Sequence, residues 1–70
     1  MKQYDVVKVV ALRDSRFASE PPHFKRHPQV GDVGTILEVY DGAFEVECSE
    51  RETGVTIWLE PMFPEELQSV

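Results

Sequence analysis

The dipeptide Asp41-Gly42 constrains the fold of this chain more than any other feature of its sequence. It separates two patterned apolar stretches within VGDVGTILEVYDGAFEVEC, residues 30–48. A type I′ turn requires positive φ at both of its central residues, and Asp-Gly is a favoured pair at those two positions. The sequence therefore predicts a β-hairpin with a two-residue turn at its tip.

Placing the turn at this dipeptide also predicts which residues lie opposite each other in the hairpin. In this register Glu38 lies opposite Glu45, and Leu37 lies opposite Val46. Gly34, inside the first strand, indicates a bulge or a close approach of another backbone. Alternate residues of a strand share a face. The inner face is predicted to hold Thr35, Leu37, Val39, Phe44, Val46 and Cys48, and the outer face Ile36, Glu38, Tyr40, Ala43, Glu45 and Glu47.

Two further segments have the composition of strands. Residues 4–12, YDVVKVVAL, are rich in β-branched side chains and indicate a strand that is buried mainly on one face. Residues 55–59, VTIWL, indicate another strand. In this second strand the predicted inward residues are Val55, Ile57 and Leu59, and the predicted outward residues are Thr56 and Trp58.

The remaining segments connect and close this arrangement. Residues 13–29 have no hydrophobic period and contain three prolines, which predicts a long loop. Near the end of the chain, PEEL predicts a short helical turn that returns Leu67 to the core. The expected fold is all-β: a small SH3-like barrel of four to five antiparallel strands, with a long loop after the first strand and a short helical turn near the C-terminus.

The length of 70 residues predicts a single domain, residues 1–70, with a thin core and no room for a deep active-site cavity. Cys48 is the one cysteine, so an internal disulfide is excluded. No apolar run approaches the roughly 20 residues of a membrane span, and no targeting segment is recognised. We therefore expect a cytoplasmic protein that does not enter a membrane.

The charge is unevenly distributed along this acidic chain. The net charge is −6, which combines +3 over residues 1–27 with −9 over residues 28–70. Nucleic-acid binders usually present a basic surface, so nucleic acid is an unfavoured partner despite the basic side chains of the loop. The acidic part could face a basic partner protein, or it could simply keep a small protein soluble.

A resemblance to a known group rests on DVVKV, VGDVGTILEVYDGAFEVEC and LEP…EEL, taken in this order. These segments resemble a family of short uncharacterised bacterial proteins, a domain of unknown function for which an SH3-like barrel is expected. HFKRHPQVGDVGTI is loosely similar to the SH3-like domain of the nitrile hydratase β subunit. The plasmid-type dihydrofolate reductase also has such barrels, but VTIW lacks the glutamine of its Val-Gln-Ile-Tyr run, so its activity is not carried over.

The sequence does not favour catalysis or metal binding. Ser15 lacks the surroundings of a nucleophile elbow, and Cys48 is expected in the core, where a thiol is inert. His23 and His27 are four residues apart, but the prolines around them oppose a helix and no third ligand is evident. We therefore predict no catalytic residue, no metal and no cofactor.

The outer face of the hairpin is the better candidate for a binding site. Like charges directly opposite each other on a sheet destabilise it, and the fold alone does not explain why Glu38 and Glu45 should form such a pair. Aromatic residues rimmed by acidic ones are typical of a surface that binds a partner. The predicted binding residues are Ile36, Glu38, Tyr40, Glu45, Glu47 and Trp58. The alternative is that the long loop covers the tryptophan and the glutamates are merely solvated.

Three functional hypotheses follow. The favoured one is a non-enzymatic protein-interaction module, which could be a subunit or a homo-oligomer. The second is an acidic immunity or antitoxin protein that neutralises a basic toxin. The third is an oligomeric enzyme with a site at a symmetry axis.

Overall fold

A computed structural model of the chain describes residues 1–13 and 17–70. The described residues form five strands in a single antiparallel sheet of order β4-β3-β2-β1-β5, together with one short 3-10 helix. The elements are β1 (Val6–Val9), β2 (Val33–Tyr40), β3 (Ala43–Ser49), β4 (Thr56–Met62), η1 (Pro64–Glu66) and β5 (Leu67–Ser69). The prediction of a small all-β domain with a helical turn near its C-terminus is therefore confirmed.

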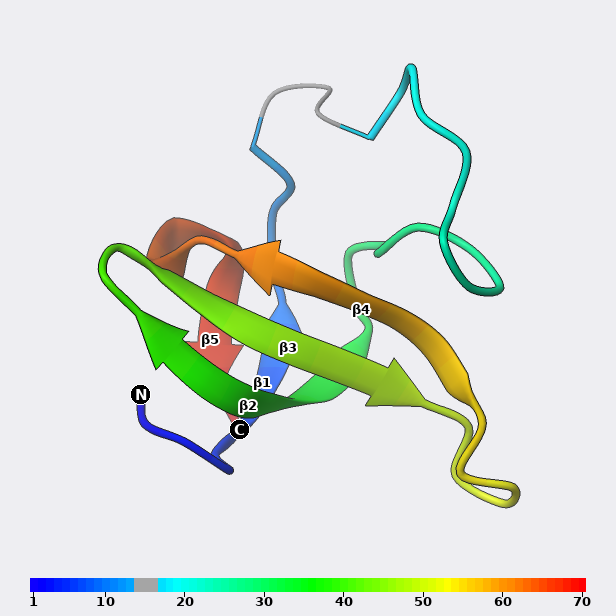
Figure 1. Ribbon diagram of the computed structural model, residues 1–70. Helices are drawn as coiled ribbons and strands as arrows, with labels where there is room; N and C mark the ends of the chain where they lie inside the picture. The colour runs from blue at the N-terminus through cyan, green and yellow to red at the C-terminus, as the bar shows by residue number, and fades with distance from the viewer. Residues whose placement is uncertain (14–16) are drawn as a thin grey trace.

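The sheet is strongly curved. Figure 1 shows β1 and β5 crossing behind β3 at a steep angle, with η1 joining the end of β4 to the start of β5. This curvature lets one face of a five-stranded sheet enclose its own core without covering helices. Within the described part of the chain, no helix is long and apolar enough to cross a membrane.

The tip of the β2–β3 hairpin has the predicted register. Tyr40 lies opposite Ala43, and Glu38 lies opposite Glu45. Gly42 has φ of +86°, but Asp41 does not have a positive φ, so the two-residue turn is not the predicted type I′. The Asp-Gly signal therefore predicted both the hairpin and the pairing of the residues next to its turn.

The predicted register fails beyond Glu38 because β2 contains a bulge. Ile36, rather than Leu37, lies opposite Val46, so Leu37 is the additional residue. An additional residue in one strand exchanges the two faces for everything beyond it. Ile36 is consequently fully buried, and the prediction that it lies on the outer face is wrong. Of the residues predicted to point inward, Val39 is exposed and Leu37 and Thr35 are only partly buried.

Gly34 lies at a close approach of two backbones, which is one of the two alternatives that the sequence predicted for this glycine. A Cβ on Gly34 would lie 2.7 Å from the carbonyl oxygen of Glu47 and 2.8 Å from Cγ1 of Val46. Only a glycine lets β2 and β3 come this close at the point where the sheet bends. The bulge itself lies three residues further along the chain, at Leu37.

Thr56 of β4 lies on the outer face as predicted, next to Glu47, but the faces beyond Ile57 are opposite to the prediction. Trp58, predicted to point outward, lies opposite Cys48 and is 1% exposed, whereas Val55 precedes the strand and is 46% exposed. The register shifts between Cys48 and Ser49, which leaves Ile57 as a second additional residue. This bulge turns the largest side chain of the strand into the core.

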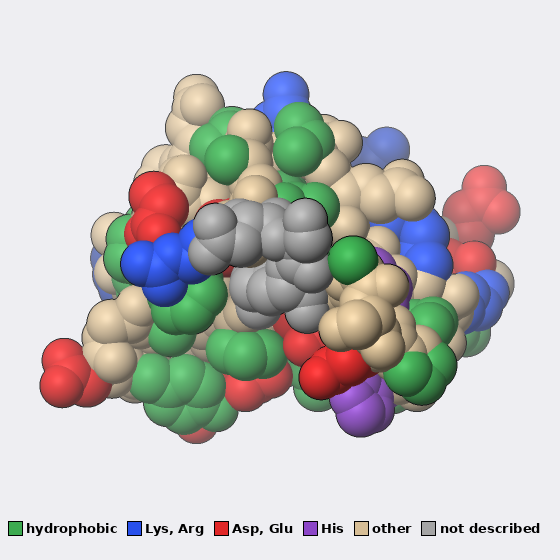
Figure 2. Space-filling model, turned by 90° about the horizontal axis from the view of Figure 1, so that it is seen from above, with side chains coloured by type: hydrophobic (Ala, Val, Ile, Leu, Met, Phe, Trp, Pro, Cys, Tyr) green, Lys and Arg blue, Asp and Glu red, His purple; other side chains and the backbone are tan. Residues whose placement is uncertain are grey.

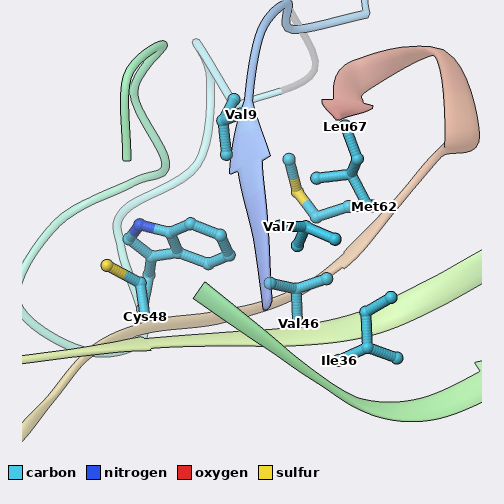
Figure 3. Packing of buried hydrophobic residues seen from close by; sticks show 8 residues of the cluster. Val7, Val9, Ile36, Val46, Cys48, Met62 and Leu67 are labelled. Carbon is cyan, nitrogen blue, oxygen red and sulfur yellow. The ribbon is translucent and has the colours of Figure 1, made fainter. Parts of the chain in front are cut away.

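Among the described residues, the core contains eight apolar side chains, which come from all five strands. Figure 3 shows Val7 of β1, Val46 of β3 and Met62 of β4 pointing toward one another. The full set is Val7, Val9, Ile36, Val46, Cys48, Trp58, Met62 and Leu67. The predictions that Cys48 and Leu67 belong to the core are confirmed.

Candidate functional site

The outer face of the β2–β3 hairpin carries acidic side chains around one tyrosine. Glu38 and Glu45 lie directly opposite each other, and Tyr40 follows on the same face. The hydroxyl of Tyr40 donates a hydrogen bond to Oε1 of Glu45 over 2.8 Å. We call Glu38, Tyr40, Glu45 and Glu47 the hairpin face.

The hydrogen bond to Glu45 raises the pKa of the Tyr40 phenol, because the neutral phenol donates to the carboxylate. The negative charges of Glu45 and Glu38 act in the same direction, since a phenolate would be repelled by both. Tyr40 therefore stays neutral, with its hydroxyl held on Glu45 and 48% of the residue exposed.

Glu47 differs from the other carboxylates of the hairpin face. Like Glu45 it is partly buried, but its Oε2 accepts a hydrogen bond of 2.7 Å from the hydroxyl of Thr56 in the neighbouring strand β4. It lies on the same face as Glu45, two residues along β3. Glu47 thus contributes charge to the face, while one of its oxygens is committed to β4.

No basic side chain in the described part of the chain forms an ion pair with the hairpin face. The ion pairs of the described residues join Arg13 to Glu65, Lys25 to Glu50 and Arg26 to Asp32. The carboxylates of the hairpin face take part in none of them. Within the described residues, the negative charge of this surface is therefore not neutralised by an ion pair.

Two of the six predicted binding residues are not on this surface. Ile36 and Trp58 both lie in the core. Ile36 directly precedes the bulge at Leu37 in β2, and Trp58 directly follows the bulge at Ile57 in β4. The other four, which form the hairpin face, lie together as predicted. An aromatic pair on the outer face therefore does not exist, and Tyr40 is the aromatic residue that remains there.

A second polar cluster, which the sequence analysis missed, is built around Asp32. The Arg26 guanidinium donates to both carboxylate oxygens of Asp32, over 2.8 Å and 3.0 Å. The indole Nε1–H of Trp58 and the backbone N–H of Gln29 also donate to Oδ2, over 2.8 Å and 2.9 Å. Since Trp58 was expected to point outward, nothing in the sequence indicated that Asp32 would meet it.

Burial and hydrogen bonding act on the pKa of Asp32 in opposite directions. Burial by itself raises the pKa of Asp32, but the bonds from Arg26, Gln29 and Trp58 outweigh it, and the pKa falls below its ordinary value of 3.8. The bond to Asp32 likewise raises the pKa of Arg26. Both groups are therefore charged at neutral pH; their ion pair joins the two ends of residues 26–32, and the bond from Trp58 to Asp32 attaches this segment to β4.

Cys48 lies next to this cluster, opposite Trp58. Burial raises the pKa of its thiol, and the negative charge of Asp32 adds to the effect. A thiol with a raised pKa is a poor nucleophile because little of it is thiolate at neutral pH. The structure thus supports the prediction that Cys48 serves packing rather than chemistry.

The basic side chains of the long loop are largely neutralised. Arg13 Nε lies 3.0 Å from Glu65, and its guanidinium carbon lies 4.1 Å from the centre of the Phe63 ring. Lys25 Nζ lies 2.7 Å from Glu50. Figure 2, a view of this side of the molecule, accordingly shows basic and acidic side chains next to one another. Arg16 and Ser15 lie outside the described residues.

The two histidines of the loop are not brought together as a metal site. His23 is exposed, whereas His27 stacks on Phe17 at 5.1 Å and its Nε2–H donates to the carbonyl oxygen of Glu20 over 2.6 Å. Among the described residues, no group of three or more His, Cys, Asp or Glu side chains could hold a metal ion.

Comparisons with known proteins add no relatives. No protein-family model matches the chain, and neither a curated protein nor a solved structure matches it. The resemblance to the family of short bacterial proteins, and the SH3-like relationship with it, therefore stay predictions.

Proposed function

We propose that this protein is a non-enzymatic protein-interaction module that binds a basic surface of a partner protein through the hairpin face. The observation that carries the proposal is the opposed pair of exposed Glu38 and partly buried Glu45, which lacks a neutralising cation among the described residues. Opposed like charges cost stability by a few tenths of a kcal/mol or more. A basic partner would relieve that repulsion when it binds.

The position of Tyr40 supports the choice of a cationic partner. Its hydroxyl is fixed to Glu45, so the ring is oriented before a partner arrives. An arginine of the partner could pair with Glu38 and Glu45 while its guanidinium stacks on this ring. A fixed ring loses little conformational entropy on binding, which favours affinity.

Self-association through aromatic residues is less well supported than the binding of a basic partner. It depended on Trp58 and Ile36 being exposed beside Tyr40, and both are buried. Binding of nucleic acid through the loop also loses support, because Arg13, Lys25 and Arg26 already pair with carboxylates. A symmetric enzyme site has no supporting observation on this surface.

An immunity or antitoxin role is the more specific form of the same proposal. It rests on the −9 balance of residues 28–70, which would suit a basic toxin as the partner. In that case an exposed acidic surface would block the basic site of the toxin. A toxin-like reading frame beside the gene would favour this form over a general interaction module.

The test is affinity capture from the native host with two charge-matched double variants. Glu38→Lys with Glu45→Lys alters the hairpin face, whereas Glu20→Lys with Glu52→Lys changes the net charge equally at exposed positions elsewhere. We expect a basic protein to be captured by the wild type and by the second variant, but not by the first. If both double variants lost the partner equally, the interaction would depend on net charge alone and not on the hairpin face. Capture of the partner by both double variants would contradict the proposal.

A further inference from the structure

The two edges of the sheet differ in how they are protected. The outer edge of β4 is partly covered, because the carbonyl oxygen of Ile57 accepts hydrogen bonds from the backbone N–H groups of Lys25 and Arg26, over 3.0 Å and 3.3 Å. Pro61, also in β4, has no N–H to offer a further strand. Covering loops and prolines are ordinary means of preventing unwanted strand pairing. Such protection is absent from the described surroundings of β5, at the opposite edge.

The hydrogen bonds between β1 and β5 define which groups of β5 face outward. Val10 N–H donates to the Glu66 carbonyl over 2.8 Å, and Val70 N–H donates to the Val6 carbonyl over 3.2 Å. Bonded pairs alternate along an antiparallel ladder, so Gln68 is also directed toward β1. The backbone groups of Leu67 and Ser69 consequently point away from the sheet.

The groups on this edge form a short alternating pattern. The N–H of Leu67 donates to the Pro64 carbonyl within the chain, so it is already used. The carbonyl of Leu67 and both backbone groups of Ser69 remain directed outward, and Ser69 is exposed. The edge therefore offers one donor, the N–H of Ser69, and two acceptors, the carbonyls of Ser69 and of Leu67 two residues before it.

This pattern is complementary to itself, and we propose that β5 pairs antiparallel with β5 of a second copy of the chain. With Gln68 of the two copies opposite each other on a two-fold axis, each Ser69 faces the other copy's Leu67. Each Ser69 N–H then donates to the opposing Leu67 carbonyl, which forms two equivalent bonds. Such an isologous contact closes on itself and gives a dimer with a continuous ten-stranded sheet rather than a fibre.

The side chains around the edge suit a second copy. Gln68 and Ser69 are uncharged, so the pairing places no like charges on the axis. Val6 and Val70 are 45% and 78% exposed beside β5 and offer apolar surface next to the new pair. The opposing term is the net charge of −6 on each copy, which repels at long range. Salt should therefore strengthen the dimer, whereas it should weaken the binding of a basic partner to the hairpin face.

Ser69→Pro tests the pairing, with Ser69→Ala as its matched control. Proline removes the N–H that points away from β1, so the internal ladder keeps its bonds, while alanine keeps the donor. The monomer–dimer dissociation constant would be measured by sedimentation equilibrium in high salt, at protein concentrations up to about 1 mM. We expect Ser69→Pro to weaken association by about ten- to a hundredfold, as the loss of two backbone hydrogen bonds implies, and Ser69→Ala to leave it unchanged.

A second variant, Gln68→Lys, tests the same pairing in case Ser69→Pro disturbs the fold. Gln68→Lys alters an exposed side chain and places two positive charges opposite each other on the axis, so it should also weaken association, most strongly at low salt. A wild type that stays monomeric at 1 mM would overturn the proposal. So would equal association of Gln68→Lys and wild type, or weakening of the dimer by Glu38→Lys with Glu45→Lys. A β5 that pairs only with strands of other proteins would overturn it as well.

Discussion

The Asp32 cluster and the hairpin face are both rich in charge, but only the first is satisfied within the chain. Asp32 receives hydrogen bonds from Arg26, Gln29 and Trp58, and it joins a loop to a strand. Glu38 and Glu45 oppose each other without a cation among the described residues. The carboxylate of Asp32 thus joins parts of the fold to one another, whereas the described residues give Glu38 and Glu45 no cation of their own.

The largest expected effect on stability comes from removing Trp58, the side chain that donates to Asp32 from the core. Trp58→Ala deletes the largest buried side chain and leaves a cavity, so we expect a loss of about 3–5 kcal/mol in the free energy of unfolding. In so small a domain this leaves much of the protein unfolded at 25 °C. Urea unfolding followed by circular dichroism would measure it, with Val55→Ala, an exposed position, changing stability by less than about 0.5 kcal/mol. Equal effects of the two changes would contradict the core position of Trp58.

Asp32→Asn should have the next largest effect, because an amide cannot keep the three donors that meet at Oδ2. We expect a loss of about 1–3 kcal/mol at pH 7. The pKa of Asp32 is lowered on folding, so its charge stabilises the fold above the unfolded pKa, and that contribution is lost as the pH falls through the folded pKa. The difference between wild type and Asp32→Asn should therefore shrink below about pH 4.

The matched control for Asp32→Asn is Asp41→Asn. Asn-Gly forms the same turn as Asp-Gly, so this change removes one carboxylate without disturbing the hairpin. Urea midpoints of both variants at pH 7 and pH 3 would make the comparison. A difference for Asp32→Asn that stays constant across this range would show that the ion pair with Arg26 does not stabilise the fold.

Changes on the hairpin face should have small effects of the opposite sign. Glu38→Gln removes the repulsion from Glu45, so we expect the free energy of unfolding to rise by a few tenths of a kcal/mol. The gain should decrease in high salt, because salt already screens the two charges. Glu52→Gln, at an exposed turn, is the control in the same thermal unfolding series. A loss of stability for Glu38→Gln would mean that this carboxylate has a structural partner.

The smallest effect concerns a titration rather than stability. The pKa of Tyr40 is raised by its hydrogen bond to Glu45, so its phenolate should form at a higher pH than that of a tyrosine in water. In a Tyr4→Phe background, ultraviolet absorbance reports Tyr40 alone. Glu45→Gln should lower the midpoint of this titration. An unchanged midpoint would remove the argument that the ring is oriented before a partner binds.

The hairpin shows both what the sequence predicts and where that prediction ends. Asp41-Gly42 is a local signal, so it predicted the turn, the pairing of Tyr40 with Ala43 and the outward position of the opposed glutamates. A bulge is different, because it depends on how the strand must bend to follow the sheet. The alternation of apolar residues fits a regular strand on either side of Leu37, so the sequence does not reveal the additional residue.

The same distinction applies to the candidate site and to the core. Composition and local periodicity determined an acidic, all-β chain with a long loop, a buried Cys48 and four of the residues assigned to its outer surface. The tertiary structure decided that Ile36 and Trp58 are core residues, because each bulge exchanges the faces beyond it. It also decided that Asp32, paired with Arg26, meets Trp58, a contact between residues 26 positions apart that no local pattern encodes. Faces follow from local sequence only while the strand is regular, and curvature is a property of the whole sheet.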